Sequence, residues 1–171
     1  MNLSKFIEDL ASCRPTPGGG AAAAVAGAMA AALVEMVAAL PPPSASGASA
    51  ARVKFKAQSA KLRKRLLELA DEDCLAFEGV MAAYKLPKEN RERGFEIEKA
   101  LKKATEVPLE TMKAAGGVEK LARKMVEKGN KNAVSDAKSA VYLAQAAQKS
   151  ARENVEINQQ SLAKLNLPKD L

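Results

Sequence analysis

The feature that most constrains the fold is an alanine-rich run, from Ala21 to Leu40, enclosed by two helix-breaking segments. The segment before it reads RPTPGGG over residues 14–20, and three prolines, Pro41–Pro43, follow it. The run is long enough to cross a membrane as a helix. However, Glu35 lies inside it and no aromatic belt flanks it, so we predict a buried helix and no membrane partner.

The small side chains of this run determine how it can pack. Ala24, Gly27, Ala28, Ala31 and Ala32 form a smooth surface that a second helix can approach closely. Alanine buries little apolar area, and aromatic residues make up only 4% of the chain. The core therefore depends on close backbone approach or on a second subunit. We predict one helical domain over residues 1–171 that assembles as an intimate homodimer or a higher homo-oligomer.

Helical periodicity continues along the rest of the chain. We predict helices over residues 3–12, 21–40, 50–84, 89–115, 118–127 and 132–150, with room for the last to continue towards Leu165. Pro108 is expected to kink or break the fourth helix, and Gly116-Gly117 to separate it from the fifth. No strand-like alternation of useful length is present. The predicted fold class is all-α, a multi-helix bundle with a long alanine-rich buried helix.

Charge and residue usage narrow the range of partners. A formal net charge of +7 favours an anionic partner, although it could also serve solubility alone. Aromatic residues are too scarce for single-stranded nucleic acid, so we predict a small anionic ligand and no nucleic acid. Histidine is absent, which removes the commonest metal ligand, so we predict no metal. Cys13 and Cys74 form no CxxC pair and follow no secretory leader, so we expect reduced, buried thiols and a cytoplasmic location.

The glycine triplet Gly18–Gly20 is the first candidate for a ligand site. Glycines at a helix start expose backbone N–H groups, and the helix dipole adds positive character there, so a carboxylate or phosphate can dock. Glycine also allows a flat ligand to lie against the main chain. The alternative is a flexible connector or tight helix packing.

Asp73 is the second candidate, because it interrupts an apolar stripe on the helix predicted over 50–84. That stripe consists of Leu62, Leu66, Leu69, Phe77, Val80 and Tyr84. A carboxylate on a buried stripe loses hydration, so its pKa should rise unless a cation pairs with it. This suits a general acid or base, or an anchor for a polar heterocycle. The alternative is an ion pair across a helix contact, and we expect Asp71 and Glu72 to face solvent.

Further polar residues lie near helix ends or on helix faces. Lys85 either caps a helix end or reaches into a cleft to meet an anion. Asp136 shares a stripe with alanines, although an acidic residue in a first turn also favours the helix dipole. Asn154 and Asn158, four residues apart, share a helix face and either meet buried polar groups or a ligand edge, or are solvated amides. Glu35 is expected to pair with a basic residue.

Four ordered segments of the sequence resemble those of a known family. They read PTPGGGAAAAVAGAMAAALVEMV, DEDCLAFEGVMAAYKLPK, VPLETMKAA, and GNKNAVSDAKSAVYLAQAA with ARENVEIN. Together they resemble the formimidoyltetrahydrofolate cyclodeaminase and methenyltetrahydrofolate cyclohydrolase family, in order and spacing, across nearly the whole chain. The resemblance implies an all-helical fold and a dimer whose active site lies near the subunit interface.

The resemblance also implies a substrate, which is a tetrahydrofolate derivative, with or without a polyglutamate tail. The excess of lysine and arginine suits that anionic tail. The glycine triplet, Asp73, Lys85 and Asp136 are implied to lie close to bound folate. The predicted site residues are therefore Asp73, Asp136 and Lys85 as catalytic residues, and Gly18, Gly19, Gly20, Asn130 and Ser135 as folate-binding residues.

The reaction implied by the resemblance closes or opens the imidazolinium ring of methenyltetrahydrofolate. We predict formimidoyltetrahydrofolate cyclodeaminase activity, which forms 5,10-methenyltetrahydrofolate and ammonia, with methenyltetrahydrofolate cyclohydrolase activity as the alternative. One segment departs from the family: residues 36–44 read MVAALPPPS where an Asn-Leu-Thr-like segment, a Gly and a Lys/Tyr-rich stretch are usual. If those residues contact substrate, the departure predicts altered specificity or an inactive folate-binding homologue. A third possibility is an unrelated helical adaptor that binds a polyanion.

Overall fold

The computed structural model describes residues 2–40 and 50–165, and every element in these ranges is helical, which confirms the predicted all-α class. The elements are α1 (Leu3–Leu10), α2 (Gly19–Ala39), α3 (Ala50–Tyr84), α4 (Arg93–Lys128), a short 3-10 helix η1 (Lys131–Ala133) and α5 (Val134–Leu165). The expected continuation of the last helix to Leu165 is confirmed. The predicted break at Pro41–Pro43 lies outside the described residues.

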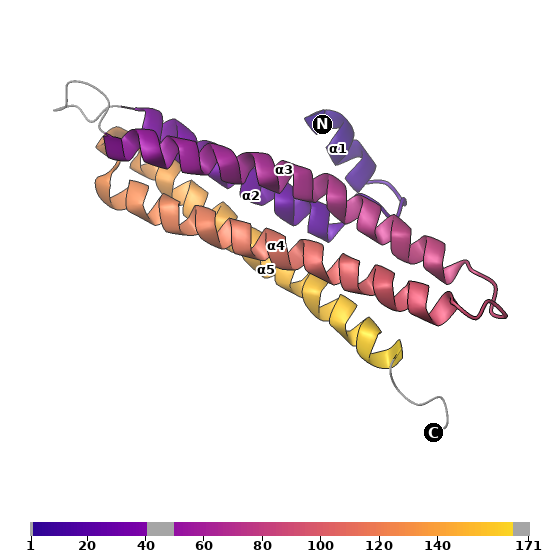
Figure 1. Cartoon of the computed structure of the whole chain (residues 1–171). Helices are drawn as coiled ribbons and strands as arrows, with labels where there is room; N and C mark the ends of the chain where they lie inside the picture. The colour runs from indigo at the N-terminus through magenta and orange to yellow at the C-terminus, as the bar shows by residue number, and fades with distance from the viewer. Residues whose placement is uncertain (1, 41–49, 166–171) are drawn as a thin grey trace.

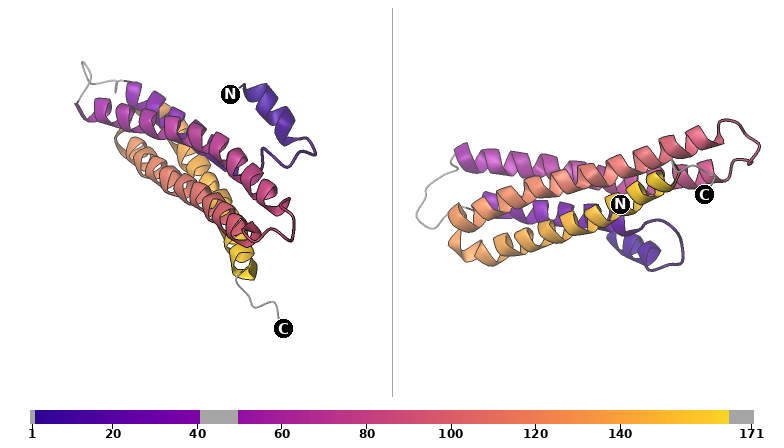
Figure 2. Two further views of the ribbon diagram at one scale, coloured as in Figure 1. Left: turned by 45° about the vertical axis from the view of Figure 1, so that its right-hand side comes forward. Right: turned by 90° about the horizontal axis from the view of Figure 1, so that it is seen from below.

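Helices α2 to α5 lie side by side as a long bundle in which consecutive helices run in opposite directions (Figures 1 and 2). The alanine-rich helix α2 contacts each of the other three. Helix α1 lies beside the bundle, and none of its residues is buried. The core and the cavity described below are therefore built by α2 to α5, together with the loop that leads into α2.

Helix α2 is by length and composition apolar and long enough to cross a membrane, but 61% of its most apolar 18-residue stretch is buried inside the protein. Its small residues allow large side chains of other helices to come close to its backbone. At Gly27, an added Cβ would lie 3.1 Å from Cδ2 of Leu66, a side chain that is fully buried. The core is thus formed by large residues of the other helices packed onto a narrow α2.

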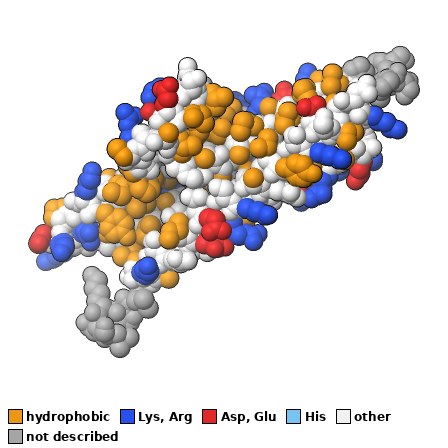
Figure 3. Space-filling model, turned by 180° about the vertical axis from the view of Figure 1, so that it is seen from behind, with side chains coloured by type: hydrophobic (Ala, Val, Ile, Leu, Met, Phe, Trp, Pro, Cys, Tyr) orange, Lys and Arg blue, Asp and Glu red, His pale blue; other side chains and the backbone are white. Residues whose placement is uncertain are grey.

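One row of α2 faces away from the bundle. The residues of this outer row are spaced alternately by four and three positions along the helix, and they are Ala22, Ala26, Met29, Leu33 and Met36. Met29 is 45% exposed and Met36 is 40% exposed. Figure 3 views the molecule from the side opposite to Figure 1, and hydrophobic side chains gather there over the middle of the bundle, next to α1. An apolar row of this kind on a helix surface is typical of a helix–helix contact.

The predicted helix break at Gly116-Gly117 is wrong, because α4 runs unbroken from Arg93 to Lys128. The two glycines instead provide room for neighbouring helices. An added Cβ at Gly117 would lie 3.4 Å from Cδ1 of Leu62 on α3, and one at Gly116 would lie 3.1 Å from Oε1 of Gln148 on α5. The lack of side chains at these positions therefore serves packing against α3 and α5. Pro108 also lies inside the helix and does not end it.

Two predictions about isolated side chains have opposite outcomes. Glu35 pairs with Arg63, whose Nε lies 2.9 Å from Oε2 of the glutamate, as expected. The prediction of a buried cysteine is wrong for Cys13. Cys13 is exposed in the loop after α1, away from the core, whereas Cys74 on α3 is half-buried and packs against the core, so the prediction holds in part for Cys74. Both thiols are free.

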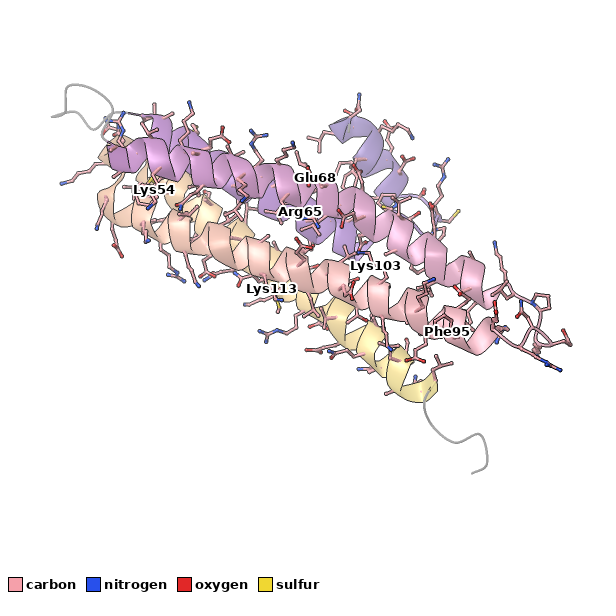
Figure 4. All side chains as sticks on the ribbon, in the orientation of Figure 1. Lys54, Arg65, Glu68, Phe95, Lys103 and Lys113 are labelled. Carbon is pink, nitrogen blue, oxygen red and sulfur yellow. The ribbon has the colours of Figure 1, made fainter. Side chains whose placement is uncertain are left out.

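Arg65 on α3 joins α3 to α4 (Figure 4). Its guanidinium donates to Glu72 on its own helix at 2.5 Å and to Glu110 on α4 at 2.8 Å. Glu72 is therefore paired and half-buried, so the expectation that it faces solvent is wrong, whereas Asp71 is exposed as predicted. The cause is the i, i+7 spacing from Arg65, which places both side chains on the same side of α3.

Candidate functional site

A cavity of about 400 Å³ lies where the start of α2 meets α3, α4 and the second half of α5. Its wall has a polar part and an apolar part. The polar side chains are Thr16, Asp73, Tyr84, Asn154, Asn158 and Ser161, and the larger apolar ones are Phe77, Val80, Leu101 and Ile157. Three larger hollows are open surface grooves between long side chains: two are lined by α3 or α4 alone, and the third lies between the end of α2 and the start of α3. The cavity at the start of α2 is less open than these grooves and is lined by several elements, so it is the better candidate for a ligand site.

Asp73 and the glycine triplet meet at one end of this cavity. The backbone N–H of Ala21, in the first turn of α2, donates to the Asp73 carboxyl group. A Cβ at Gly20 would overlap that carboxyl group, lying 2.6 Å from its carbon. Glycine at this position therefore allows Asp73 to sit against the first turn of the helix. Gly18 and Gly19 line the cavity, and Gly20 is buried beneath it.

The environment of Asp73 favours its protonated form. Burial raises the pKa of the Asp73 carboxyl group, and the hydrogen bond from Ala21 opposes this rise in part. No Lys or Arg among the described residues forms an ion pair with Asp73, so the alternative of an ion pair across a helix contact is not found. The positive end of the α2 dipole stabilises negative charge at the same place. The carboxyl group can thus hold a proton and also carry charge after losing it.

Two amides of α5 line the cavity opposite α3. Asn154 Nδ2 donates to the backbone oxygen of Ser150 at 2.9 Å, and Asn158 Nδ2 donates to the backbone oxygen of Ala104 at 2.7 Å. Both side chains are half-buried. An added Cβ at Gly19 would lie 3.5 Å from Asn154 Nδ2, so the start of α2 also approaches this side of the cavity. The amides thus bond to partly buried backbone groups and line the cavity, and their contact with a ligand edge stays a prediction.

Lys85 follows directly after the end of α3, one residue beyond Tyr84, which lines the cavity. The lysine side chain is exposed and does not line the cavity wall. Its backbone N–H donates to the carbonyl groups of Met81 and Ala82, which closes the helix. Its contact with an anionic part of a ligand stays a prediction.

Asn130, Ser135 and Asp136 lie at the opposite end of the bundle. The side chain of Asn130 caps η1, Ser135 is exposed, and Asp136 is half-buried in the first turn of α5. An added Cβ at Gly129 would lie 3.0 Å from Cγ1 of Val37, near the end of α2, whereas the cavity is at its start. The 21 residues of α2 separate the two ends by about 30 Å at 1.5 Å per residue. Within one subunit, Asp136 and Asp73 therefore do not share a cavity, and the predicted roles of these three residues stay predictions.

Several cavity residues were not predicted as site residues. Phe77 and Tyr84 were assigned to the apolar stripe of α3, but they are 37% and 43% exposed because that part of the stripe borders the cavity. Thr16 and Ser161 carried no recognisable signal. They are single hydroxyl side chains in a loop and on a helix end, and only the tertiary fold brings them together.

Comparison with known proteins identifies the family. The model of the formiminotransferase-cyclodeaminase family matches residues 2–170, which is nearly the whole chain. The chain belongs to the formiminotransferase-cyclodeaminase family. The resemblance found in the four sequence segments is thereby confirmed.

Two members of the formiminotransferase-cyclodeaminase family show how far the similarity extends. The chain is similar to a methenyltetrahydrofolate cyclohydrolase of Methylorubrum extorquens, with 42% identity over 166 residues, covering 94% of this chain and 80% of that protein. Its fold is similar to the crystal structure of formiminotetrahydrofolate cyclodeaminase from Thermotoga maritima. That match has a TM-score of 0.85 and 34% identity, and it covers 95% of this chain and 80% of the other. The family fold thus carries enzymes that act on one-carbon adducts of tetrahydrofolate.

Proposed function

We propose that this protein is a formimidoyltetrahydrofolate cyclodeaminase that forms 5,10-methenyltetrahydrofolate and ammonia. The observation that supports this most is the position of Asp73. It is a partly buried carboxyl group of raised pKa, without a basic partner among the described residues, at the first turn of α2 and on the wall of a cavity. The reaction needs an acidic group that first protonates the leaving nitrogen and then, as a carboxylate, lies beside the cationic ring that has formed.

The proposed reaction assigns two successive tasks to Asp73. The substrate carries its formimidoyl group as an amidinium on N5, and N10 attacks the formimidoyl carbon to form the second C–N bond. The protonated Asp73 gives its proton to the amino nitrogen, the bond from carbon to that nitrogen breaks, and ammonia leaves. The carboxylate then stabilises the methenyl cation until it takes up the proton that N10 has lost. In this proposal, Asp73 serves first as the acid and then as the negative charge beside the cation, in a cavity that holds little water.

Methenyltetrahydrofolate cyclohydrolase activity is the second candidate, because the relative with 42% identity bears that name. In this reaction, water attacks the methenyl carbon, one C–N bond opens and formyltetrahydrofolate forms. Asp73 as carboxylate would stabilise the bound cation and accept a proton from the attacking water. The two candidates are separated by supplying formimidoyltetrahydrofolate or methenyltetrahydrofolate to the same enzyme preparation.

The assignment of Asp73 is tested by Asp73→Asn, with the exposed Asp71→Asn two residues earlier as the matched control. Ammonia release and the absorbance of methenyltetrahydrofolate report on turnover. Because Asn cannot donate an acidic proton, we expect Asp73→Asn to lower kcat by at least about a hundredfold, within the range of general acid catalysis, and Asp71→Asn to leave it unchanged. Full activity of Asp73→Asn would overturn the assignment.

We further propose that two copies pack through the outer row of α2 and that the site is shared between them. Two α2 helices that pack in antiparallel orientation about a two-fold axis place the start of one beside the end of the other. That arrangement would bring Asn130, Ser135 and Asp136 of one subunit towards the cavity of its partner. It would also allow Lys85 to meet an anionic part of folate. We propose, in addition, that the protein works in the cytoplasm, without a metal, a membrane or a nucleic acid.

The α2 contact is tested by Met29→Glu, since Met29 is 45% exposed and can change without disturbing the core. A charge in an apolar interface is strongly unfavourable, so sedimentation should show a monomer. Phe95→Glu, at a 65% exposed position on α4, is the control and should leave the oligomeric state unchanged. A dimer of unchanged affinity in Met29→Glu would exclude this surface.

A further inference from the structure

Pro108 leaves a gap in the hydrogen bonding of α4. Proline has no backbone N–H, so it cannot donate to the carbonyl group four residues earlier, and its ring pushes against that group. The carbonyl group in question belongs to Ala104, which lines the cavity. A buried carbonyl group needs a donor from elsewhere.

Asn158 of α5 supplies this donor, with its Nδ2 at 2.7 Å from the backbone oxygen of Ala104. A carbonyl oxygen can only accept, so the amide must turn its nitrogen towards α4. This contact fixes which way the amide faces, and therefore leaves Oδ1 on the other side. The orientation of a cavity amide is thus set by a proline on a different helix.

The Oδ1 atom of Asn158 still has its full capacity to accept hydrogen bonds. No donor from the described part of the chain bonds to it, and it is not sealed off from solvent. Asn154, one turn earlier, also has its Nδ2 bonded to a backbone carbonyl group, so its oxygen is likewise left as an acceptor. The two asparagines therefore give the α5 side of the cavity two amide oxygens that can accept hydrogen bonds from a ligand.

We propose that Asn158 is a specificity-determining residue whose Oδ1 accepts a hydrogen bond from an N–H group of the ligand, and that Pro108 positions it. The inference rests on the proposed function, in which the ligand is a pterin. A reduced pterin ring carries an exocyclic amine and ring N–H groups, which require acceptors. An amide free to rotate would present a donor to the same edge half of the time, whereas the one held by Ala104 presents only an acceptor.

The test is calorimetric titration of this chain with 5-formyltetrahydrofolate, in wild type and three variants. Asn158→Leu should weaken binding by at least about tenfold, because the ligand N–H loses its acceptor. Pro108→Ala changes no polar side chain of the cavity, but it restores the N–H that competes for Ala104, so binding should weaken by about threefold. The double variant should bind like Asn158→Leu, since Pro108 acts only through Asn158.

Gln159→Leu is the matched control, because Gln159 is exposed on the same helix and does not line the cavity. Gln159→Leu should bind like wild type. Pro108→Ala should unfold at a temperature equal to or higher than that of wild type, which would show that its weaker binding comes from the orientation of the Asn158 amide and not from a less stable fold. Should Asn158→Leu fail to fold, Pro108→Ala alone decides. Unchanged affinity in Asn158→Leu or Pro108→Ala, or additive losses in the double variant, would overturn the inference while leaving the proposed function intact. Absence of binding by wild type would instead overturn both.

Discussion

The contact between Gly20 and Asp73 gives a prediction whose magnitude follows from the structure. In Gly20→Ala, the new Cβ would lie 2.6 Å from the carboxyl carbon of Asp73, so the side chain must move. It then loses the hydrogen bond from Ala21, which contributes about 1.5–3 kcal/mol at a pH where the carboxyl group is ionised. Alanine gains at most about 1 kcal/mol over glycine from helix propensity. The net result is a loss of about 1 kcal/mol in the free energy of unfolding.

Gly79→Ala is the matched control for this variant. Gly79 is also in a helix, α3, but a Cβ there would meet no atom within 4 Å. This substitution should therefore gain the propensity term alone, about 1 kcal/mol. The two variants should differ by about 2 kcal/mol, or roughly 4–8 °C in Tm for a chain of this size.

Thermal unfolding by circular dichroism, together with the ammonia-release assay, measures both consequences. Gly20→Ala should also lower turnover by at least about tenfold, because the proposed acid is displaced from the start of α2. Gly79→Ala should retain full turnover. Adding Asp73→Ala to Gly20→Ala should recover stability, since the overlap is removed. The reasoning is refuted if Gly20→Ala is as stable and as active as Gly79→Ala.

Three further predictions follow from other contacts. Arg65→Met should lower the free energy of unfolding by about 1 kcal/mol in urea titrations at low salt, and by less at high salt. The control is Arg123→Met, which removes an ion pair whose arginine side chain is 57% exposed and should lower the free energy of unfolding by under about 0.5 kcal/mol. Equal effects of the two substitutions would contradict the link between α3 and α4. Burial raises the pKa of Asp73, so its stabilising contribution is complete below the ordinary aspartate pKa and is lost as pH rises through the raised pKa. Asp73→Asn should remove this decline from the pH dependence of stability, and an unchanged profile would contradict the burial effect. Mixing inactive Asp73→Asn and Asp136→Asn chains should restore about one quarter of wild-type turnover if the site is shared between subunits, and none if it is not.

The parts of the fold that could be predicted from the sequence are those determined by local periodicity. The bounds of α3 were predicted from apolar spacing that ends near Pro87, and α2 from the change between glycine, alanine and proline. The break at Gly116-Gly117 was wrongly predicted because a glycine pair has two opposite uses. A glycine pair ends a helix where no other element packs against it, and it allows close packing where a neighbouring helix lies against it. Only the tertiary structure distinguishes these two cases.

The site was predictable to the extent that its residues break a pattern. Asp73 stands on an apolar stripe, and Asn154 and Asn158 pair four residues apart, so each gave a signal. The link between Pro108 and Asn158 gave none, because it joins residues 50 positions apart through a backbone carbonyl group, with no spacing rule to reveal it. Asp136 lies at the opposite end of the bundle from the cavity, and its proposed role requires the proposed α2 contact between two copies, which the spacing in one sequence does not specify.

The central claim is that burial against the start of α2 raises the pKa of the Asp73 carboxyl group. The most direct measurement is a pH titration of the Asp73 carboxyl carbon by NMR in the folded protein, with Asp73→Asn used to assign the signal. Burial predicts a titration midpoint above the ordinary range of an aspartic acid pKa. A midpoint within or below that range would contradict the account, because the group would then behave as a solvated carboxylate whose affinity for a proton is not raised by burial.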